Sequence, residues 1–248
     1  MYNKVKTPKE IEAIRESGKM LSAVLLKIEE VLKPGMTGLE IDELANNMLK
    51  EMGGVPAFLG YQGFPNSICI SVNDAVVHGI PNNTPFKSGD IVGFDFGVIY
   101  EGMITDAART FIVGEASKEV EKLVASTKRS LDNAINTVKN GCSVGDIANA
   151  AQTVLDSGNY GIVRDLVGHG VGHNVHEEPE IPNYGVSGTG PKLKSGMTIA
   201  IEPMATLGDY KVVIDPDGWT IRTRDGSLSA HFEDTILVTD DGAEILTR

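Results

Sequence analysis

The sequence has little cysteine, little histidine and no apolar run long enough to cross a bilayer. Its 248 residues include two cysteines, five histidines and one tryptophan. Two cysteines are too few for a disulfide scaffold, which favours a reducing compartment. The Met1–Glu10 segment lacks the apolar stretch of a signal peptide, and a membrane-spanning helix would need about 20 apolar residues. We therefore expect a cytoplasmic protein with no membrane partner.

Basic residues are also scarce. Lys and Arg number 22 against 34 Asp and Glu, which gives a formal net charge of −12. Such a balance argues against a sequence-independent grip on nucleic acid, so we expect no specific nucleic-acid partner. The hydrophobic fraction of 41% and the charged fraction of 23% are ordinary for a globular protein. We expect a monomer.

Two apolar runs each lead to an acid with no basic residue close behind it. Glu202 ends the run that Lys194-Ser195-Gly196 opens, and Asp95 ends the matching run after Lys87-Ser88-Gly89. Neither acid is followed by a Lys or Arg within the next eight residues. A buried carboxylate needs a proton, hydrogen bonds or a cation. A metal site is one interpretation, and a pair of buried, protonated or hydrogen-bonded acids is the other.

Further candidate ligands follow in each half of the chain. We expect Asp106 in the strand 103–113 and Glu233 in the last strand of the second half, within 231–236. Three of the five histidines fall in the glycine-rich stretch Gly168–Pro179. Four carboxylates and one neutral imidazole carry a charge of −4, which two divalent cations would neutralise. Oxygen-rich ligation with one histidine suits Mn, Fe, Co or Zn. Each residue alone has a bland explanation, because a strand acid is usually a turn or edge residue, and His173 or His231 could simply form hydrogen bonds.

Two phrases recur at nearly the same spacing. Lys33–Ile41 and Lys139–Ile147 share a Lys-x-Gly start, a hydroxyl cap and an acid three residues later, at an offset of 106. The Lys-Ser-Gly phrases recur at an offset of 107. These repeats predict an internal duplication, an α/β (α+β) fold with helices and strands in each half. Caps, breakers and periodicity place helices at 8–32, 38–52 and 118–138, strands at 67–72, 91–100 and 103–113, and a loop at 53–65. The candidates for the buried face of the first helix are Ile11, Ile14, Met20, Leu21, Val24, Leu25 and Ile28.

Gly168-His169-Gly170-Val171-Gly172, followed by His176 and by Ile181-Pro182-Asn183-Tyr184, resembles the signature of bacterial-type type I methionine aminopeptidases. Matching phrases follow in family order along the chain: Cys69–Asn73, His78–Pro81, Gly89–Val92, Ile201–Met204 and Asp217–Thr220. The resemblance implies the pita-bread fold, with pseudo-twofold halves and a central curved antiparallel sheet flanked by helices, as a single catalytic domain over residues 1–248. It implies removal of an N-terminal methionine when the second residue is small, with water activated by two metals attacking the first peptide bond.

The resemblance also implies roles for individual residues and for partners. Asp106 and Glu233 would bridge two divalent ions (Co, Mn, Fe or Zn), Asp95 would complete one shell, and His169 with Glu202 the other. Glu202, His78 and His176 would be catalytic, with both histidines also contacting the substrate. Peptide and nascent-protein N-termini are the implied partners, and the ribosome is a further candidate. The methionine socket would draw on the following apolar or aromatic side chains: Phe58, Tyr61, Phe64, Cys69, Val175 and Trp219.

The chain departs from the family pattern at three places. Leu166 stands where an aromatic is usual, Asp234 where histidine is common, and Val175 where a larger side chain is often found. We expect Asp234 to alter metal affinity or hydrogen bonding around the ligands. We expect the small Val175 to reshape the pocket so that a somewhat larger second substrate residue, such as Val or Thr, is accepted. Two alternatives are a pita-bread peptidase acting on Xaa-Pro bonds, which usually carries an additional N-terminal domain, and a non-catalytic relative, which typically lacks metal ligands.

Overall fold

The structure, a computed structural model, describes residues 4–248, so the first three residues of the Met1–Glu10 segment lie outside it. The first half contains two helices, a 3-10 turn and five strands. Their bounds are α1 Pro8–Val31, α2 Gly38–Met52, β1 Val55–Pro56, the 3-10 turn Tyr61–Gly63, β2 Cys69–Val72, β3 Ala75–Val77, β4 Ile91–Tyr100 and β5 Met103–Ile112. The predicted helices and strands of this half are confirmed to within two residues at each end. The segment 53–65, expected to be a loop, also holds β1 and the 3-10 turn.

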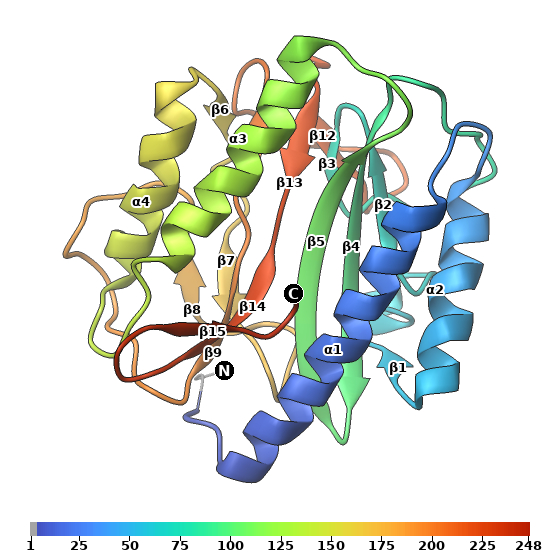
Figure 1. Ribbon diagram of the computed structural model, residues 1–248. Helices are drawn as coiled ribbons and strands as arrows, with labels where there is room; N and C mark the ends of the chain where they lie inside the picture. The colour runs from blue at the N-terminus through green and yellow to red at the C-terminus, as the bar shows by residue number, and fades with distance from the viewer. Residues whose placement is uncertain (1–3) are drawn as a thin grey trace.

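The second half repeats the plan of two helices followed by strands (Figure 1). Its elements are α3 Lys118–Ile135, α4 Val144–Ser157, β6 Gly161–Ile162, β7 Gly168–Gly170, β8 Glu177–Ile181, β9 Thr198–Ile201, β10 Met204–Thr206, β11 Val212–Ile214, β12 Ile221–Thr223, β13 Ser229–His231, β14 Asp234–Val238 and β15 Ala243–Ile245. Glu233 was expected inside the last strand, and this is wrong. Glu233 lies in the break between β13, which pairs with β10, and β14, which pairs with β9.

The duplication predicted from the sequence is visible in the hydrogen bonds that close each half. Gly35 N–H donates to the Phe86 carbonyl at 2.8 Å, and Gly141 N–H donates to the Leu193 carbonyl at 2.9 Å. These pairs are related by offsets of 106 and 107, as in the sequence repeats. Capping boxes open α2 and α4 at the matching positions. The repeated phrases therefore encode equivalent helix starts, and in each half the turn before the helix is hydrogen-bonded to an equivalent chain segment.

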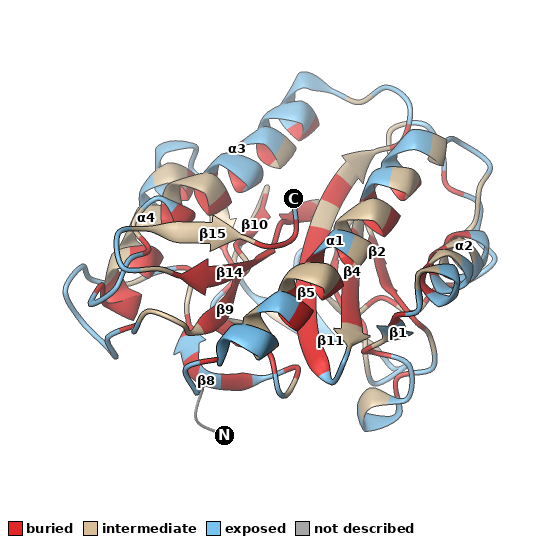
Figure 2. Cartoon of the chain, turned by 60° about the horizontal axis from the view of Figure 1, so that its bottom comes forward, coloured by how far each residue is buried: buried red, intermediate tan, exposed pale blue. Residues whose placement is uncertain are grey.

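Small residues let α1 approach the strands closely. Ser17 donates to the Val98 carbonyl at 2.9 Å, and a Cβ on Gly18 would lie 2.0 Å from the Leu246 carbonyl oxygen. Ile11 and Met20, expected on the buried face, are only partly buried, whereas the other expected residues are buried: Ile14, Leu21, Val24, Leu25 and Ile28. Figure 2 shows the resulting pattern, in which the helices turn buried strips towards the strands and exposed faces outward.

All strand pairings are antiparallel, and the two halves join along β5 and the β13–β14 segment. Ala108 and Glu233 exchange backbone hydrogen bonds of 2.9 and 3.3 Å across this seam. Beside them, the Thr235 hydroxyl accepts from Asp106 N–H at 2.9 Å and donates to the Asp106 carbonyl at 2.7 Å. Side-chain hydroxyls thus complete the pairing where the backbones diverge, which leaves room for side chains between the halves.

No helix within residues 4–248 is both long and apolar enough to cross a membrane.

Candidate active site

A cavity of about 140 Å³ opens at the seam between the halves. All thirteen side chains proposed from the sequence line it, and Gln62 is the one additional residue. The lining consists of Phe58, Tyr61, Gln62, Phe64, Cys69, His78, Asp95, Asp106, His169, Val175, His176, Glu202, Trp219 and Glu233. Gln62 lies in the 3-10 turn inside the segment expected to be a loop, and no sequence pattern marked it.

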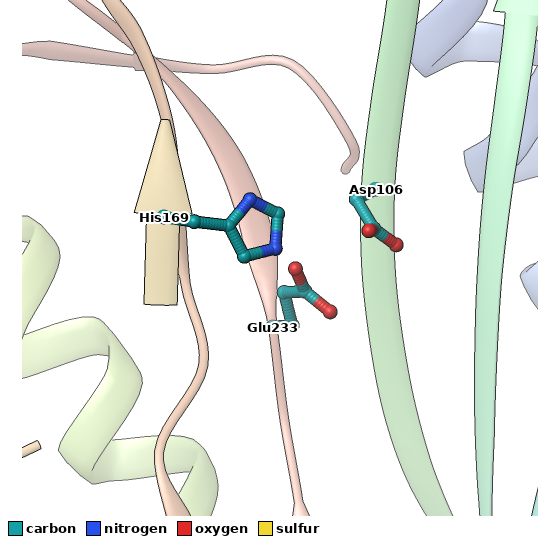
Figure 3. A group of neighbouring side chains, drawn as sticks. All are labelled: Asp106, His169 and Glu233. Carbon is teal, nitrogen blue, oxygen red and sulfur yellow. The ribbon is translucent and has the colours of Figure 1, made fainter. Parts of the chain in front are cut away.

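Three potential metal ligands converge from separate parts of the chain (Figure 3). Asp106 comes from β5, His169 from β7, and Glu233 from the break between β13 and β14. One ligand atom from each lies within 4.8 Å of the others, and all three residues are buried. The first half supplies one of these ligands and the second half supplies two, so the cluster exists only when the halves are joined.

Asp95 and Glu202 flank this cluster. Asp95 stands in the middle of β4, opposite Ala108 of β5 and Cys69 of β2. Glu202 directly follows β9, and its Oε1 lies 3.5 Å from His169 Nε2. Each acid therefore comes from a Lys-Ser-Gly phrase, as the sequence repeat suggested, and both face the same cavity.

Burial and mutual repulsion favour the protonated forms of the four acids. The pKa of Asp106 is raised to about 7, mainly by burial. The pKa of Asp95 is raised well above its ordinary value by burial and then by the charges of Asp106 and Glu202. Burial followed by the charge of Asp106 likewise raises the pKa values of Glu202 and Glu233. Clustering the four ionised carboxylates would therefore require cations.

His169 is arranged to offer a lone pair. Its Nδ1 lies 2.9 Å from the Gly170 carbonyl, a group that can only accept, so Nδ1 carries the proton and donates. Burial, followed by the nearby His176, lowers the pKa of His169 to about 3. The neutral ring thus presents an unprotonated Nε2 towards Glu202, which is the form that binds metal ions.

Two further histidines face the same space. His176 Nδ1 lies 3.0 Å from the Tyr61 hydroxyl, and its ring centroid is 4.4 Å from that of His169. His78 has a φ of 57°, a left-handed conformation that costs a β-carbon-bearing residue about 1–3 kcal/mol. Burial, followed by His176, lowers the pKa of His78 to about 4. Both rings are therefore neutral near pH 7, because burial also lowers the pKa of His176.

An apolar wall completes the cavity. Phe64 and Trp219 meet edge to face, with ring centroids 5.2 Å apart. Phe58, Cys69 and Val175 are buried in the same hydrophobic cluster. Burial and four nearby acids raise the pKa of the Cys69 thiol well above its ordinary value, so it stays a neutral, apolar side chain.

The departure at Asp234 has a clear structural setting. Its fully buried carboxylate accepts from Arg109 at 2.6 Å, from Arg248 at 2.7 Å and from the Thr247 hydroxyl at 2.8 Å. Arg109 also donates to the Glu233 backbone carbonyl. The extra acid is therefore paired with two guanidinium groups instead of adding an unpaired charge to the cluster. No local sequence signal predicted this pairing, because Arg109 and Arg248 are 139 residues apart in the chain.

The donor atoms that remain unused fit divalent metal ions. Asp95 Oδ1, Asp106 Oδ1 and Glu233 Oε1 are buried and have no hydrogen-bond partner among residues 4–248. Buried carboxylate oxygens without partners are rare and costly in folded proteins. Hard oxygen donors beside one neutral imidazole form the ligand type that Mn, Fe, Co and Zn accept.

The whole chain is similar to known proteins of one class. The model of metallopeptidase family M24 matches residues 12–240. The crystal structure of methionine aminopeptidase from Thermotoga maritima matches with a TM-score of 0.98 and 46% identity, over 99% of each chain. The methionine aminopeptidase of Clostridium acetobutylicum is 46% identical over 98% of each chain. A prolidase from Pyrococcus furiosus has a TM-score of 0.79 and 25% identity, over 98% of this chain and 65% of its own.

The chain belongs to metallopeptidase family M24, a family of metal-dependent hydrolases. Its pita-bread fold and its buried acidic cluster agree with this assignment. Within that family its full-length likeness is to the methionine aminopeptidases, which confirms the family predicted from the signature around His169. The chain is therefore an aminopeptidase that depends on divalent metal ions.

Proposed function

We propose that this protein removes the N-terminal methionine from peptides and nascent proteins whose second residue is small. The observation that carries the proposal is one cavity that combines the acidic cluster with an apolar wall. The wall, formed by residues such as Phe58, Phe64 and Trp219, suits a flexible thioether side chain. Burying such a side chain is worth ~1.5–3 kcal/mol, which favours methionine over smaller or polar residues.

The residues that would hold two divalent ions are Asp95, Asp106, His169, Glu202 and Glu233. Candidate metals are Co, Mn, Fe and Zn, which accept this donor set. When bound, such ions polarise a carbonyl and lower the pKa of water towards ~7.

The protein side chains then move protons and stabilise charge. Glu202 accepts a proton from the attacking water and passes it to the leaving amine, as a general base and then a general acid. His176 donates from Nε2 to the developing oxyanion in the tautomer whose Nδ1 accepts from the Tyr61 hydroxyl, 3.0 Å away. His78 contacts the peptide beyond the scissile bond. Asp95 lies where the substrate's free α-amine would bind, which restricts cleavage to chain ends.

Selection for a small second residue follows from the limited space beside the acidic cluster. The cavity measures about 140 Å³, and the rings of Tyr61 and His176, with centroids 5.8 Å apart, both line it. In the proposed complex the second side chain lies beside these two rings. A bulky second side chain would displace one of these rings, whereas Ala or Ser would not.

We further propose a single catalytic domain that acts as a monomer in the cytoplasm. The sequence repeat and the shared seam support the single domain. Two free, buried cysteines support a reducing compartment. The ribosome is a candidate partner because the proposed substrates include nascent chains. No membrane partner is proposed.

Hydrolysis of three tripeptides tests the function. We expect methionine release from Met-Ala-Ser in the presence of added Mn, Co, Fe or Zn, and little release from Met-Lys-Ser. Ala-Pro-Ser tests the alternative of an Xaa-Pro peptidase, which the fold likeness to prolidase keeps open. Cleavage of Ala-Pro-Ser without cleavage of Met-Ala-Ser would replace our proposal with that alternative.

A further inference from the structure

A buried ion pair lies beneath the loop that carries His176. Lys6 Nζ lies 2.9 Å from Glu177 Oε2, and the two side chains are 0% and 1% exposed. Lys6 precedes α1, whereas Glu177 is the first residue of β8, 171 positions later. Burying two charges destabilises the fold unless the charges are well paired and hydrogen-bonded. Removing only one partner destabilises it further, because the other charge is then buried without compensation.

Glu177 uses its other oxygen to hold the loop. Oε1 accepts from His173 N–H at 2.7 Å and from Asn174 N–H at 3.1 Å. A carboxylate that binds a cation through one oxygen and two backbone N–H groups through the other has a fixed orientation. The Glu177 carboxylate thereby ties the two ends of the segment from His173 to Glu177 together, and it joins this segment to the Lys6 ammonium.

The backbone of the loop is shaped to admit the Lys6 side chain. Gly172 has a φ of 142°, and a Cβ at this position would lie 2.5 Å from Lys6 Cε. Glycine is therefore required at position 172, where the aliphatic part of the Lys6 side chain packs against the loop backbone. The Lys6 N–H also donates to the Gly196 carbonyl at 2.8 Å, which fixes the lysine relative to the turn before β9.

The anchored segment contains side chains that the proposed reaction uses. His176 is bonded directly to Glu177, and Val175 of the apolar wall precedes it. Glu177 also lies opposite Gly170 in the β7–β8 pairing, one residue from His169. A shift of the Glu177 carboxylate would therefore move the His176 ring relative to its neighbour His169, whose centroid is 4.4 Å away.

We propose that Lys6 and Glu177 are positioning residues that fix the His176 ring for oxyanion stabilisation. The inference rests on the role of His176 in the proposed function. Lys6 touches none of the proposed reacting groups and acts through Glu177 and the loop. A displacement of about 1 Å at a catalytic group can cost up to about 100-fold in rate.

A double-mutant cycle between Lys6→Met and His176→Ala tests this role. The reaction is Met-Ala-Ser hydrolysis at saturating Mn²⁺. We expect Lys6→Met to lower kcat by about 10-fold to about 100-fold with unchanged metal content. In the His176→Ala background the same substitution should change kcat by less than about 2-fold, because the group it positions is already absent. An equal loss in both backgrounds would overturn the proposal, as would a Lys6→Met variant as active as wild type.

A second variant separates positioning from folding. Lys6→Met/Glu177→Gln removes both charges and leaves no unpaired buried ion, so its Tm should exceed that of Lys6→Met while its kcat stays low. Recovery of wild-type kcat in this variant would contradict the proposal. Lys19→Met is the matched control, because Lys19 forms an exposed pair with Glu16 at 2.6 Å, and its kcat should equal that of wild type. Failure of the proposed function itself would be seen separately, as absent methionine release by wild type or wild-type kcat in His176→Ala.

Discussion

The two halves of the molecule share a backbone plan but contribute different chemistry to the cavity. Each half has a capped helix docked on a turn, followed by a Lys-Ser-Gly phrase and a strand that leads to an acid. The first half contributes the shorter acids, Asp95 and Asp106, and the second half contributes Glu202 and Glu233. Aromatic wall residues come mainly from the first half, whereas His169 and His176 come from the second.

The contrast shows which features a duplicated fold must keep and which it can change. Caps, turns and strand pairing are set by backbone geometry, so their residue types recur at offsets of 106 and 107. Side chains that point into the seam are free to differ. The second half needs close backbone approach at β7, where a Cβ on Gly168 would lie 2.5 Å from the Ala200 carbonyl oxygen. That approach brings His169 next to Glu202, whereas β2, which pairs with the Asp95 strand β4, contains no histidine.

Removing the metal should have the largest effect on activity, because both halves contribute ligands to the proposed metal site. Treatment with a chelator should abolish methionine release, and added Mn²⁺ should restore it. At a metal concentration of about 100 times Kd, each bound ion stabilises the fold by about 2.7 kcal/mol, which corresponds to a fall in Tm of about 5–11 °C per ion on chelation. Scanning calorimetry with and without chelator measures this fall, and an unchanged Tm would show that the acids are satisfied without ions.

The same experiment has a defined pH dependence. The folded pKa of Asp106, about 7, lies above its ordinary value of 3.8. The unfolded chain therefore ionises first, and the stability of the metal-free protein falls as the pH rises from about 4 towards 7. The fall in Tm on chelation should accordingly be larger at pH 8 than at pH 5.5. A larger fall at pH 5.5 would contradict this assignment of the acids.

His176→Ala removes the proposed oxyanion donor, which only the second half supplies. We expect kcat for Met-Ala-Ser to fall by about 10²–10³-fold, the usual cost of losing one oxyanion donor. Bound metal should stay at the wild-type level, because His176 is not assigned as a ligand. Elemental analysis beside the kinetic assay checks both points, and loss of metal would reassign His176 to the metal shell.

Val175→Phe has the smallest expected effect. The sequence suggested that this position limits the second substrate residue, whereas the structure places Val175 in the cluster with Phe58, Phe64 and Cys69. A phenylalanine ring there would take space from the methionine side chain, and losing ~1 kcal/mol of its burial should lower kcat/KM by about 5-fold on every Met peptide. Ratios between Met-Ala, Met-Thr and Met-Val peptides should stay constant. A selective loss on Met-Val would support the first interpretation.

Much of the fold could be predicted because its signals are local. The boxes at Thr37 and Ser143 fix helix starts, and the strand Ile91–Tyr100 carries no charged side chain other than Asp95. The five ligands could be proposed because the family signature and the repeat mark them, and they stay a prediction. Long-range contacts left no such trace. The pairing of Asp234 with Arg109 and Arg248 depends on tertiary packing, and so does the strand break at Glu233.

The most direct test of this division between the halves compares two matched variants over a Mn²⁺ titration. Asp95→Asn and Glu202→Gln each remove one proposed ligand charge, at equivalent positions of the repeat. We predict that excess Mn²⁺ restores much of the methionine release by Asp95→Asn, because only metal affinity is lost. Glu202→Gln should remain about 10²–10⁴-fold below wild type at its plateau, since it also lacks the general base. Equal plateaus for the two variants would contradict the account.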